Sequence, residues 1–100
     1  MEAVYFFTYE QERELNKVLD QDFFKRIGPT LREAKILGIE NRDGFFVYLS
    51  SPEDSIKKAE ELLKETAQVE RLYDKELEEV INKIKVEDKN AQAGMGLIFG

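Results

Sequence analysis

Residues 44–54 read GFFVYLSSPED, and this stretch decides how the middle of the chain folds. Residues 44–50 are mostly aromatic, β-branched or aliphatic, a composition typical of a β-strand. Ser51 then suits the N-cap of a helix and Pro52 its first position, while the two acids that follow suit the positive end of the helix dipole. The stretch therefore predicts a strand over 44–50 and a helix that begins directly after it.

The residues that follow this junction predict a helix and then a strand. The helix has an apolar stripe at helical spacing among Lys and Glu, made of Ile56, Ala59, Leu62 and Leu63. It is expected to end near Glu65. Residues 67–73 (AQVERLY) place Val69, Arg71 and Tyr73 at alternating positions, which predicts a fourth, edge-like strand.

The residues before the junction predict a hairpin. EAKILGIEN, residues 33–41, precedes 44–50, and Gly44 is placed to supply the positive φ of a hairpin with a bulge. Within residues 30–37, however, Thr30 and Glu33 have the spacing of a capping box. A short helix there is therefore the open alternative to a strand.

Residues 10–27 predict a helix, because apolar side chains recur at helical spacing among Glu, Arg and Lys. Thr8 and Gln11 are placed like a capping box at its start. Gly28 can adopt the left-handed conformation of a helix end, and the proline after it cannot extend the hydrogen-bond ladder. The helix is expected to end there and to bend near Asp20.

The residues from 74 onward predict one more helix and an apolar tail. Asp74 can cap a helix over about 75–88. Its apolar stripe consists of Leu77, Val80, Ile81 and Ile84. Residues 90–100 (NAQAGMGLIFG) form the tail, for which three states stay open: docking within the subunit, docking across subunits, or disorder.

These elements together predict one α+β domain over residues 1–100. AVYFFTY, residues 3–9, supplies the first strand, so the order is βαββαβ followed by the extra C-terminal helix and the apolar tail. Over about residues 3–73 this order resembles the ferredoxin-like sandwich, a four-stranded antiparallel sheet with two helices on one face. The resemblance is one of architecture, and the fold hosts many unrelated functions.

Strands 3–9 and 44–50 are apolar on both faces, although a sheet with helices on one face should alternate apolar and polar residues. Because a bare aromatic face is rare on a monomer, something is expected to cover the second face. The candidates are a second copy in a homodimer, the last helix, and a ligand. The predicted oligomer interface consists of Tyr5, Phe7, Tyr9, Phe46, Tyr48, Leu97, Ile98 and Phe99.

The composition excludes several kinds of chemistry. The 100 residues include no Cys and no His, which removes disulfides, thiolate or imidazole metal sites and the Ser-His and Cys-His nucleophiles. The formal net charge is -6, so neither nucleic acid nor an anionic membrane is expected as a partner. No basic leader and no membrane-spanning segment are visible, so we expect a cytoplasmic protein. Its dense charge is typical of thermophile proteins.

The candidate catalytic and metal-binding groups all have simpler explanations. Asp20 and Asp22 offer oxygen ligands for a hard cation, but they lack the Gly and the distal Glu of an EF-hand loop. Glu40 and Asp43 form a carboxylate pair near a hairpin tip, where such residues also serve turn geometry. We therefore predict no catalytic residue, no cofactor and no metal site, and the question of enzymatic activity stays open with the residues leaning against it.

The expected function is that of a noncatalytic regulatory, adaptor or small-ligand-binding module that acts as a homodimer or higher homo-oligomer. The alternative is a module associated with single-stranded RNA, which stacks bases on sheet aromatics. That platform would consist of Tyr5, Phe7, Phe46 and Tyr48. Residues 41–50 faintly resemble the third-strand pattern of RNA recognition modules, but they lack the small residue between the aromatics.

Overall fold

The computed structural model describes the backbone of residues 1–66 and 68–99, and the side chains within 1–66 and 68–87. Among these residues, four strands form one sheet with neighbours in the order β2-β3-β1-β4, and every neighbouring pair is antiparallel. The strands are β1 (Glu2–Thr8), β2 (Thr30–Glu33), β3 (Gly44–Ser50) and β4 (Glu70–Arg71). The domain is α+β, as predicted.

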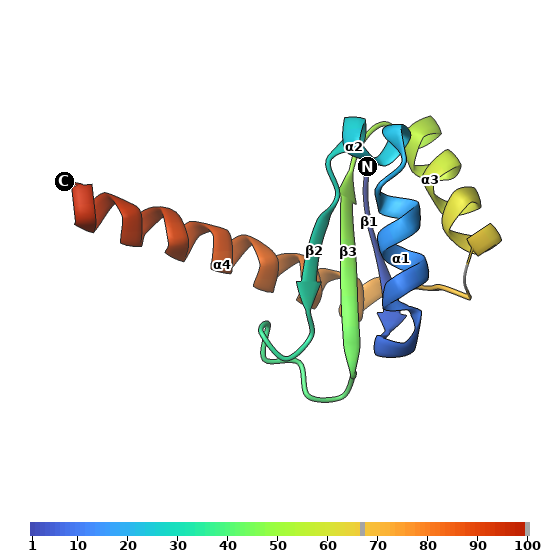
Figure 1. Cartoon of the computed structure of the whole chain (residues 1–100). Helices are drawn as coiled ribbons and strands as arrows, with labels where there is room; N and C mark the ends of the chain where they lie inside the picture. The colour runs from blue at the N-terminus through green and yellow to red at the C-terminus, as the bar shows by residue number, and fades with distance from the viewer. Residues whose placement is uncertain (67, 100) are drawn as a thin grey trace.

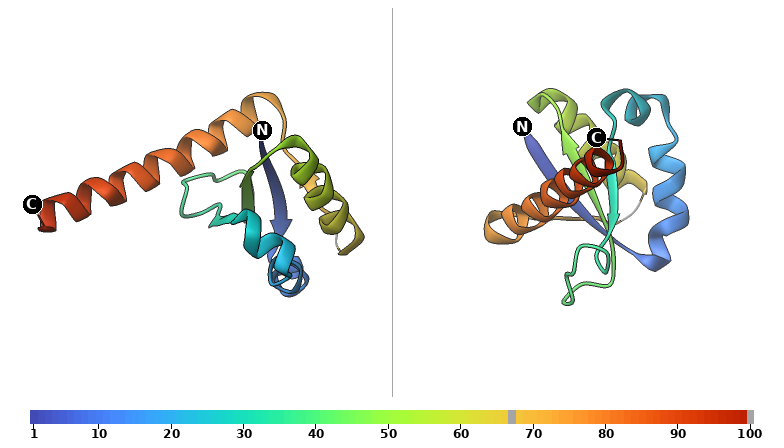
Figure 2. Two further views of the ribbon diagram at one scale, coloured as in Figure 1. Left: turned by 90° about the horizontal axis from the view of Figure 1, so that it is seen from above. Right: turned by 90° about the vertical axis from the view of Figure 1, so that its left-hand side faces the viewer.

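Helices lie on both faces of this sheet (Figure 1, Figure 2). One face carries α1 (Glu12–Leu19), α2 (Asp22–Ile27) and α3 (Glu53–Thr66), and a short 3-10 helix, η1 (Tyr9–Gln11), leads into α1. The last helix, α4 (Asp74–Phe99), crosses the other face and continues away from the sheet (Figure 1). The sheet is thus enclosed between two helical layers.

This arrangement departs from the plain βαββαβ sandwich that the sequence predicts. The first crossover contains η1 and two separate helices, and β4 is only 2 residues long. Helices cover both faces instead of one, because α4 buries its own apolar stripe against the second face. A two-layer sandwich with one face left uncovered by its own chain is therefore not what this sequence forms.

The register of β1 with β3 decides which aromatics share a face, because directly opposite residues of an antiparallel pair point the same way. The pairs facing α4 are Val4 with Tyr48 and Phe6 with Phe46. The pairs facing α1 and α3 are Tyr5 with Val47 and Phe7 with Phe45. The predicted grouping of Tyr5 and Phe7 with Phe46 and Tyr48 is wrong, since it requires a register shifted by one residue.

The core beneath α1, α2 and α3 is built from alternate residues of both central strands. Its fully buried members are Ala3, Tyr5, Phe7, Leu15, Val18, Phe24, Val47, Leu49, Ile56, Ala59 and Leu63. Each large apolar side chain buried in this way contributes about 1.5–3 kcal/mol. The stripe predicted for residues 56–63 is confirmed, since Ile56, Ala59 and Leu63 are buried and Leu62 packs against them.

The core beneath α4 fills the second face of the sheet. Its buried members are Val4, Ala34, Leu37, Ile39, Phe46, Leu72, Val80, Ile81 and Ile84, with Phe6, Tyr48 and Leu77 packed against them. The rings of Phe6 and Phe46 lie 5.6 Å apart in a tilted arrangement. The prediction that the second face is covered is confirmed, and within the described chain the cover is α4.

The predicted helix boundaries around α1 and α2 are confirmed. The backbone N–H of Thr8 donates to Oε1 of Gln11 at 3.0 Å, as the capping box requires. The helix breaks after Leu19, close to Asp20, and resumes at Asp22. Gly28 ends it with φ of 64°, a conformation that glycine adopts without strain.

The hairpin forms, but its first strand lies earlier than predicted. Residues 30–33 form β2, and residues 34–38 make turns, closed by a hydrogen bond from the Ile39 N–H to the Ala34 carbonyl at 3.0 Å. The compact turn lets Ala34, Leu37 and Ile39 all reach the core beneath α4. The predicted strand over 33–41 is therefore wrong, and the open alternative of a short helix before residue 38 is not formed either.

Gly44 is required for a reason other than the predicted turn. Its φ of 159° is close to extended, but a Cβ atom built on it would lie 2.0 Å from the carbonyl oxygen of Phe7. No side chain larger than hydrogen fits where β1 and β3 approach each other so closely.

The last helix is longer than predicted. Its backbone is helical from Asp74 to Phe99, so it does not end near residue 88. Ala91, Gln92, Ala93 and Met95 are good helix formers, which explains why the two glycines at 94 and 96 do not end it. The side chains from residue 88 onward lie outside the described part of the chain. The docking of the 90–100 tail therefore stays a prediction.

Candidate interaction surface

The acidic residues considered as candidates for catalysis or metal binding do not form a common site. Glu40 and Asp43 are both exposed on the loop between β2 and β3. Asp20 and Asp22 are also exposed, and Asp20 pairs with Lys25 at 3.3 Å. Among the residues that the structure describes, no group of three or more acidic side chains lies close enough to hold a metal ion.

Most of the predicted interface residues are buried inside the subunit. Tyr5 and Phe7 lie beneath α1 and α3, with exposures of 0% and 1%. Phe46 is fully buried beneath α4, and Tyr48 is half-buried there. Leu97, Ile98 and Phe99 belong to the backbone of α4, but their side chains lie outside the described residues. The four sheet aromatics therefore form neither a common patch nor a common stacking platform.

Tyr9 is the predicted interface residue with the most exposed side chain among those described, at 39%. Its hydroxyl donates to Oε1 of Glu33 at 2.9 Å, and its ring meets the edge of Phe45 at a centroid distance of 5.2 Å. The Lys35 ammonium lies 5.8 Å from the same ring. Desolvation raises the pKa of Tyr9, and the bond to Glu33 adds to the effect. Tyr9 is thus engaged within its own subunit.

An apolar groove lies where the turn after β2 meets the outer side of α4. We call it the Ile36–Val86 groove, and its lining residues are Ile36, Leu37, Asn82, Lys83, Val86 and Glu87. It has a volume of about 530 Å³. Ile36 is 67% exposed and Val86 is 56% exposed, which makes them two of the most exposed large apolar side chains described.

Local structure explains why these two side chains face outward. In the turn over residues 34–38, Ala34 and Leu37 point into the core, which leaves Ile36 on the outer side. On α4 the buried residues 80, 81 and 84 define the sheet-facing stripe, and Val86 lies two positions beyond it, where the helix faces away from that stripe. An apolar residue off the stripe is the sequence signal for a second surface on this helix.

Ion pairs hold both walls of the groove in place. Nε of Arg32, on β2, lies 3.1 Å from Oε1 of Glu87, on α4, and both side chains are partly buried. Two residues earlier on α4, Nζ of Lys85 lies 3.4 Å from Oε2 of Glu2, which also accepts a hydrogen bond from the Tyr48 hydroxyl. That bond lowers the pKa of Glu2, while burial raises the pKa of Tyr48. The helix is therefore fixed to β1 and β2 by polar contacts.

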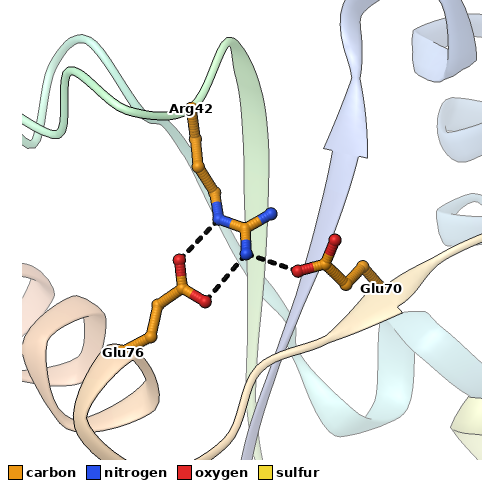
Figure 3. Close-up of polar contacts among 3 residues, drawn as sticks. All are labelled: Arg42, Glu70 and Glu76. Atoms are coloured by element: carbon orange, nitrogen blue, oxygen red, sulfur yellow. Dashed lines mark hydrogen bonds and ion pairs between the residues drawn. The ribbon is translucent and has the colours of Figure 1, made fainter.

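Arg42 fixes the start of α4 in a similar way (Figure 3). Its Nε lies 2.6 Å from Oε2 of Glu76, its Nη2 lies 2.8 Å from Oε1 of the same residue, and Nη2 also bonds Glu70. The guanidinium carbon lies 4.8 Å from the ring centre of Phe6. Hydrogen bonding to Arg42 lowers the pKa of Glu76 and, in turn, raises that of Arg42. We call this cluster the Arg42 clamp.

Comparison of the chain with protein-family models, with curated protein sequences and with solved structures finds no match. Within the described part of the chain, no helix combines the length and the apolarity needed to cross a bilayer. The surface of the molecule itself is therefore what can indicate its function.

Sequence reasoning misses the groove and the clamp. The sequence pattern predicts a strand around Ile36. It assigns Val86 to no surface, because only the apolar residues on the buried side of α4 form a recognisable stripe. The pattern places Arg42 at a hairpin tip, where its partners on β4 and α4 are invisible, since they follow it by 28 and 34 residues. Val86 alone leaves a signal, as an apolar residue that does not fit the spacing of its neighbours.

Proposed function

We propose that the protein is a noncatalytic interaction module that works as a homo-oligomer, and that the Ile36–Val86 groove is its contact surface. The observation that carries this proposal is the pair of exposed aliphatic side chains, Ile36 and Val86, on two walls of one groove. Grouped exposed apolar residues mark interaction sites, whereas single ones are ordinary on a soluble protein.

The composition of the groove favours a protein partner. Ile36, Leu37 and Val86 give it an aliphatic side, and its polar side chains, Asn82, Lys83 and Glu87, come from α4 alone. Sites for small ligands usually bring several polar groups from different elements together in an enclosed cavity. A groove that runs along a helix instead suits another helix laid beside it.

The alternative of an RNA-associated module finds less support. Its four stacking residues lie on opposite faces of the sheet, and three of them are fully buried. A formal net charge of -6 also opposes binding to phosphates. Binding to single-stranded RNA is therefore an outcome that the experiment below must exclude.

For the fold, we propose an elaborated ferredoxin-like domain. Two crossovers on one face of an antiparallel sheet, joined by a central hairpin, support this classification. The divided first helix, the short fourth strand and the layer formed by α4 are the elaborations. An experimental structure in which β4 does not pair with β1 would contradict it.

The function is tested by the mass of the protein in solution. Sedimentation equilibrium over a range of concentrations should give a mass above that of the 11.7 kDa monomer. A variant with Ile36→Ser and Val86→Ser should remain folded and shift toward the monomer. Tyr73→Ser is the matched control, since Tyr73 is 61% exposed and does not line the groove.

Two results would contradict the proposal. One is a monomer at every concentration, and the other is equal weakening of the assembly by the control and by the groove variant. Titration with a labelled oligouridylate belongs to the same series. Tight binding that weakens with salt would support the RNA alternative instead.

A further inference from the structure

We infer that the groove is occupied by the last part of α4 from a second copy, in an antiparallel pair of helices. This inference rests on the proposed function, because it names the segment that binds in the Ile36–Val86 groove. It is carried by the course of α4, by the spacing of its residues and by the absence of charge in its last turns.

The first observation is the course of the helix. Up to Glu87, α4 contributes to the core beneath it or to the groove. Residues 88–99 continue the same helix away from the sheet (Figure 1, Figure 2). At 1.5 Å per residue this extension is about 18 Å long. No other element of the described chain lies beside it in either figure.

The second observation is its composition. Residues 90–99 (NAQAGMGLIF) include no charged side chain, although 36% of the whole chain is charged. An isolated helix with two glycines and no ion pairs has little intrinsic stability in water. A segment of this kind is stabilised by packing against another surface, and its apolar residues suit an aliphatic groove.

The third observation is helical spacing from Val86. Positions 90, 93 and 97 follow Val86 at intervals of four, three and four residues, and so lie on the same face of the helix. They carry Asn, Ala and Leu, with Gly94 beside them. Small residues at 93 and 94 permit a close approach of two helix backbones.

These positions are self-complementary under two-fold symmetry. When two copies of α4 run antiparallel about an axis at Asn90, Gly94 of one copy faces Val86 of the other, and Leu97 faces Lys83. Each end of the pair then lies about 10 Å from the axis, which is the distance spanned by seven residues of helix. Position 97 of each copy thus lies beside the groove of the other, and one contact forms twice, as a two-fold interface requires.

The symmetry axis can be tested by cross-linking, because the chain has no cysteine of its own. Asn90→Cys places one thiol per chain on the axis, where two copies meet closely enough for a disulfide. Under mild oxidation, most of the Asn90→Cys protein should become a covalent dimer. In the same time, only a small fraction of the Lys57→Cys protein should do so. Lys57 is the control, since it is exposed on α3, away from the groove.

A second pair of variants tests the occupant of the groove. Leu97→Lys should reduce the dimer fraction at least tenfold, because it places a second cation opposite Lys83 of the other copy. Gln92→Lys adds the same charge on the opposite side of the helix and should leave the dimer intact. Neither variant should unfold the body of the subunit, which near-ultraviolet circular dichroism of its buried aromatic residues reports, since the buried residues that α4 gives to the core end at Ile84.

The outcomes separate this inference from the proposed function. If the groove variant dissociates the assembly but Asn90→Cys cross-links no faster than Lys57→Cys, the groove is an interface and the antiparallel helix pair is wrong. An assembly that survives Leu97→Lys would likewise show that the helix pair is wrong. A wild-type chain that is monomeric at every concentration contradicts the proposed function as well.

Discussion

Arg42 joins the β2–β3 loop to β4 and to α4 through one side chain. Its side chain is only 16% exposed, and it bonds both oxygens of Glu76 while also reaching Glu70. A planar fork of donors can satisfy two carboxylates at once, which a lysine ammonium does less well. The start of α4 is therefore positioned by geometry that depends on arginine in particular.

Replacing Arg42 with glutamine should lower the free energy of unfolding by about 1–2 kcal/mol, since two carboxylates lose a charged donor and one of them is partly buried. Urea denaturation followed by circular dichroism measures the change. Lys85→Gln removes a more exposed ion pair to Glu2 and should cost no more than about 0.5 kcal/mol. Equal effects of the two substitutions would show that the clamp contributes no more than a surface ion pair.

Stability should fall as the pH is lowered below about 4.5, the ordinary carboxyl value of Glu76 and Glu2. Both have a lowered pKa in the folded state, so their contribution is present above the unfolded pKa and is lost as the pH falls through the folded pKa. The urea midpoint measured from pH 7 to pH 3 should drop less steeply for Arg42→Gln than for the wild type. Parallel curves would contradict the role given to the Arg42 clamp.

Tyr5 is a second residue whose environment predicts a pH effect. Burial raises its pKa to about 12, and no described residue accepts a hydrogen bond from its hydroxyl. Because the unfolded chain ionises near pH 10 and the folded one does not, stability falls as the pH rises from about 10 toward 12. Tyr5→Phe should flatten that fall and should change stability at pH 7 by no more than about 1 kcal/mol.

The urea midpoints of the wild type and of Tyr5→Phe, measured between about pH 10 and pH 12, test this prediction. Tyr73→Phe, at an exposed site, controls for the loss of a hydroxyl. A loss of more than about 2 kcal/mol at pH 7 for Tyr5→Phe would show that the hydroxyl does have a stabilising partner.

At the scale of the elements, local signals predicted where helices begin and end. The capping box of Thr8 and Gln11 and the left-handed Gly28 are both present, and α3 begins just after Pro52. Each of these signals depends on the conformation of a few neighbouring residues, so the sequence carries it directly. The buried stripes of α3 and α4 were predicted for the same reason.

Strand pairing could not be predicted in the same way. Residues 33–41 contain alternating apolar positions, but in the structure they form turns that direct Leu37 and Ile39 toward α4. No local sequence signal indicates that Tyr5 pairs with Val47. This pairing determines which face of the sheet Tyr5 occupies. Register depends on contacts between residues far apart in the chain, and one shift by a residue exchanges the two faces.

The contact between β1 and β3 predicts a strong effect at Gly44. Gly44→Ala should lower the free energy of unfolding by more than about 2 kcal/mol, since its Cβ would lie 2.0 Å from the Phe7 carbonyl oxygen and the strands must move apart. Gly28→Ala is the comparison, because nothing lies within 4 Å of its Cβ and only its φ of 64° is unfavourable. It should cost about 1–2 kcal/mol. A milder effect at Gly44 than at Gly28 would contradict the close approach of the strands.

At the scale of the whole molecule, the aromatic second face of the sheet is an interior surface. Phe6, Phe46 and Tyr48 are covered by α4 of the same subunit, so their apolar character does not indicate assembly. The surface that we propose for assembly is instead the outer side of α4, where Val86 and Ile36 remain exposed. The sequence predicted that an extra helix could cover the sheet, but the groove arises only once that helix is in place beside the turn.

The central claim is that two copies associate through the Ile36–Val86 groove. Sedimentation equilibrium of the wild type beside the Ile36→Ser and Val86→Ser variant tests it most directly. We predict a dimer mass for the wild type and, at the same concentration, a mass near the 11.7 kDa monomer for the variant. Identical masses for the two proteins, whether monomer or dimer, would contradict the claim.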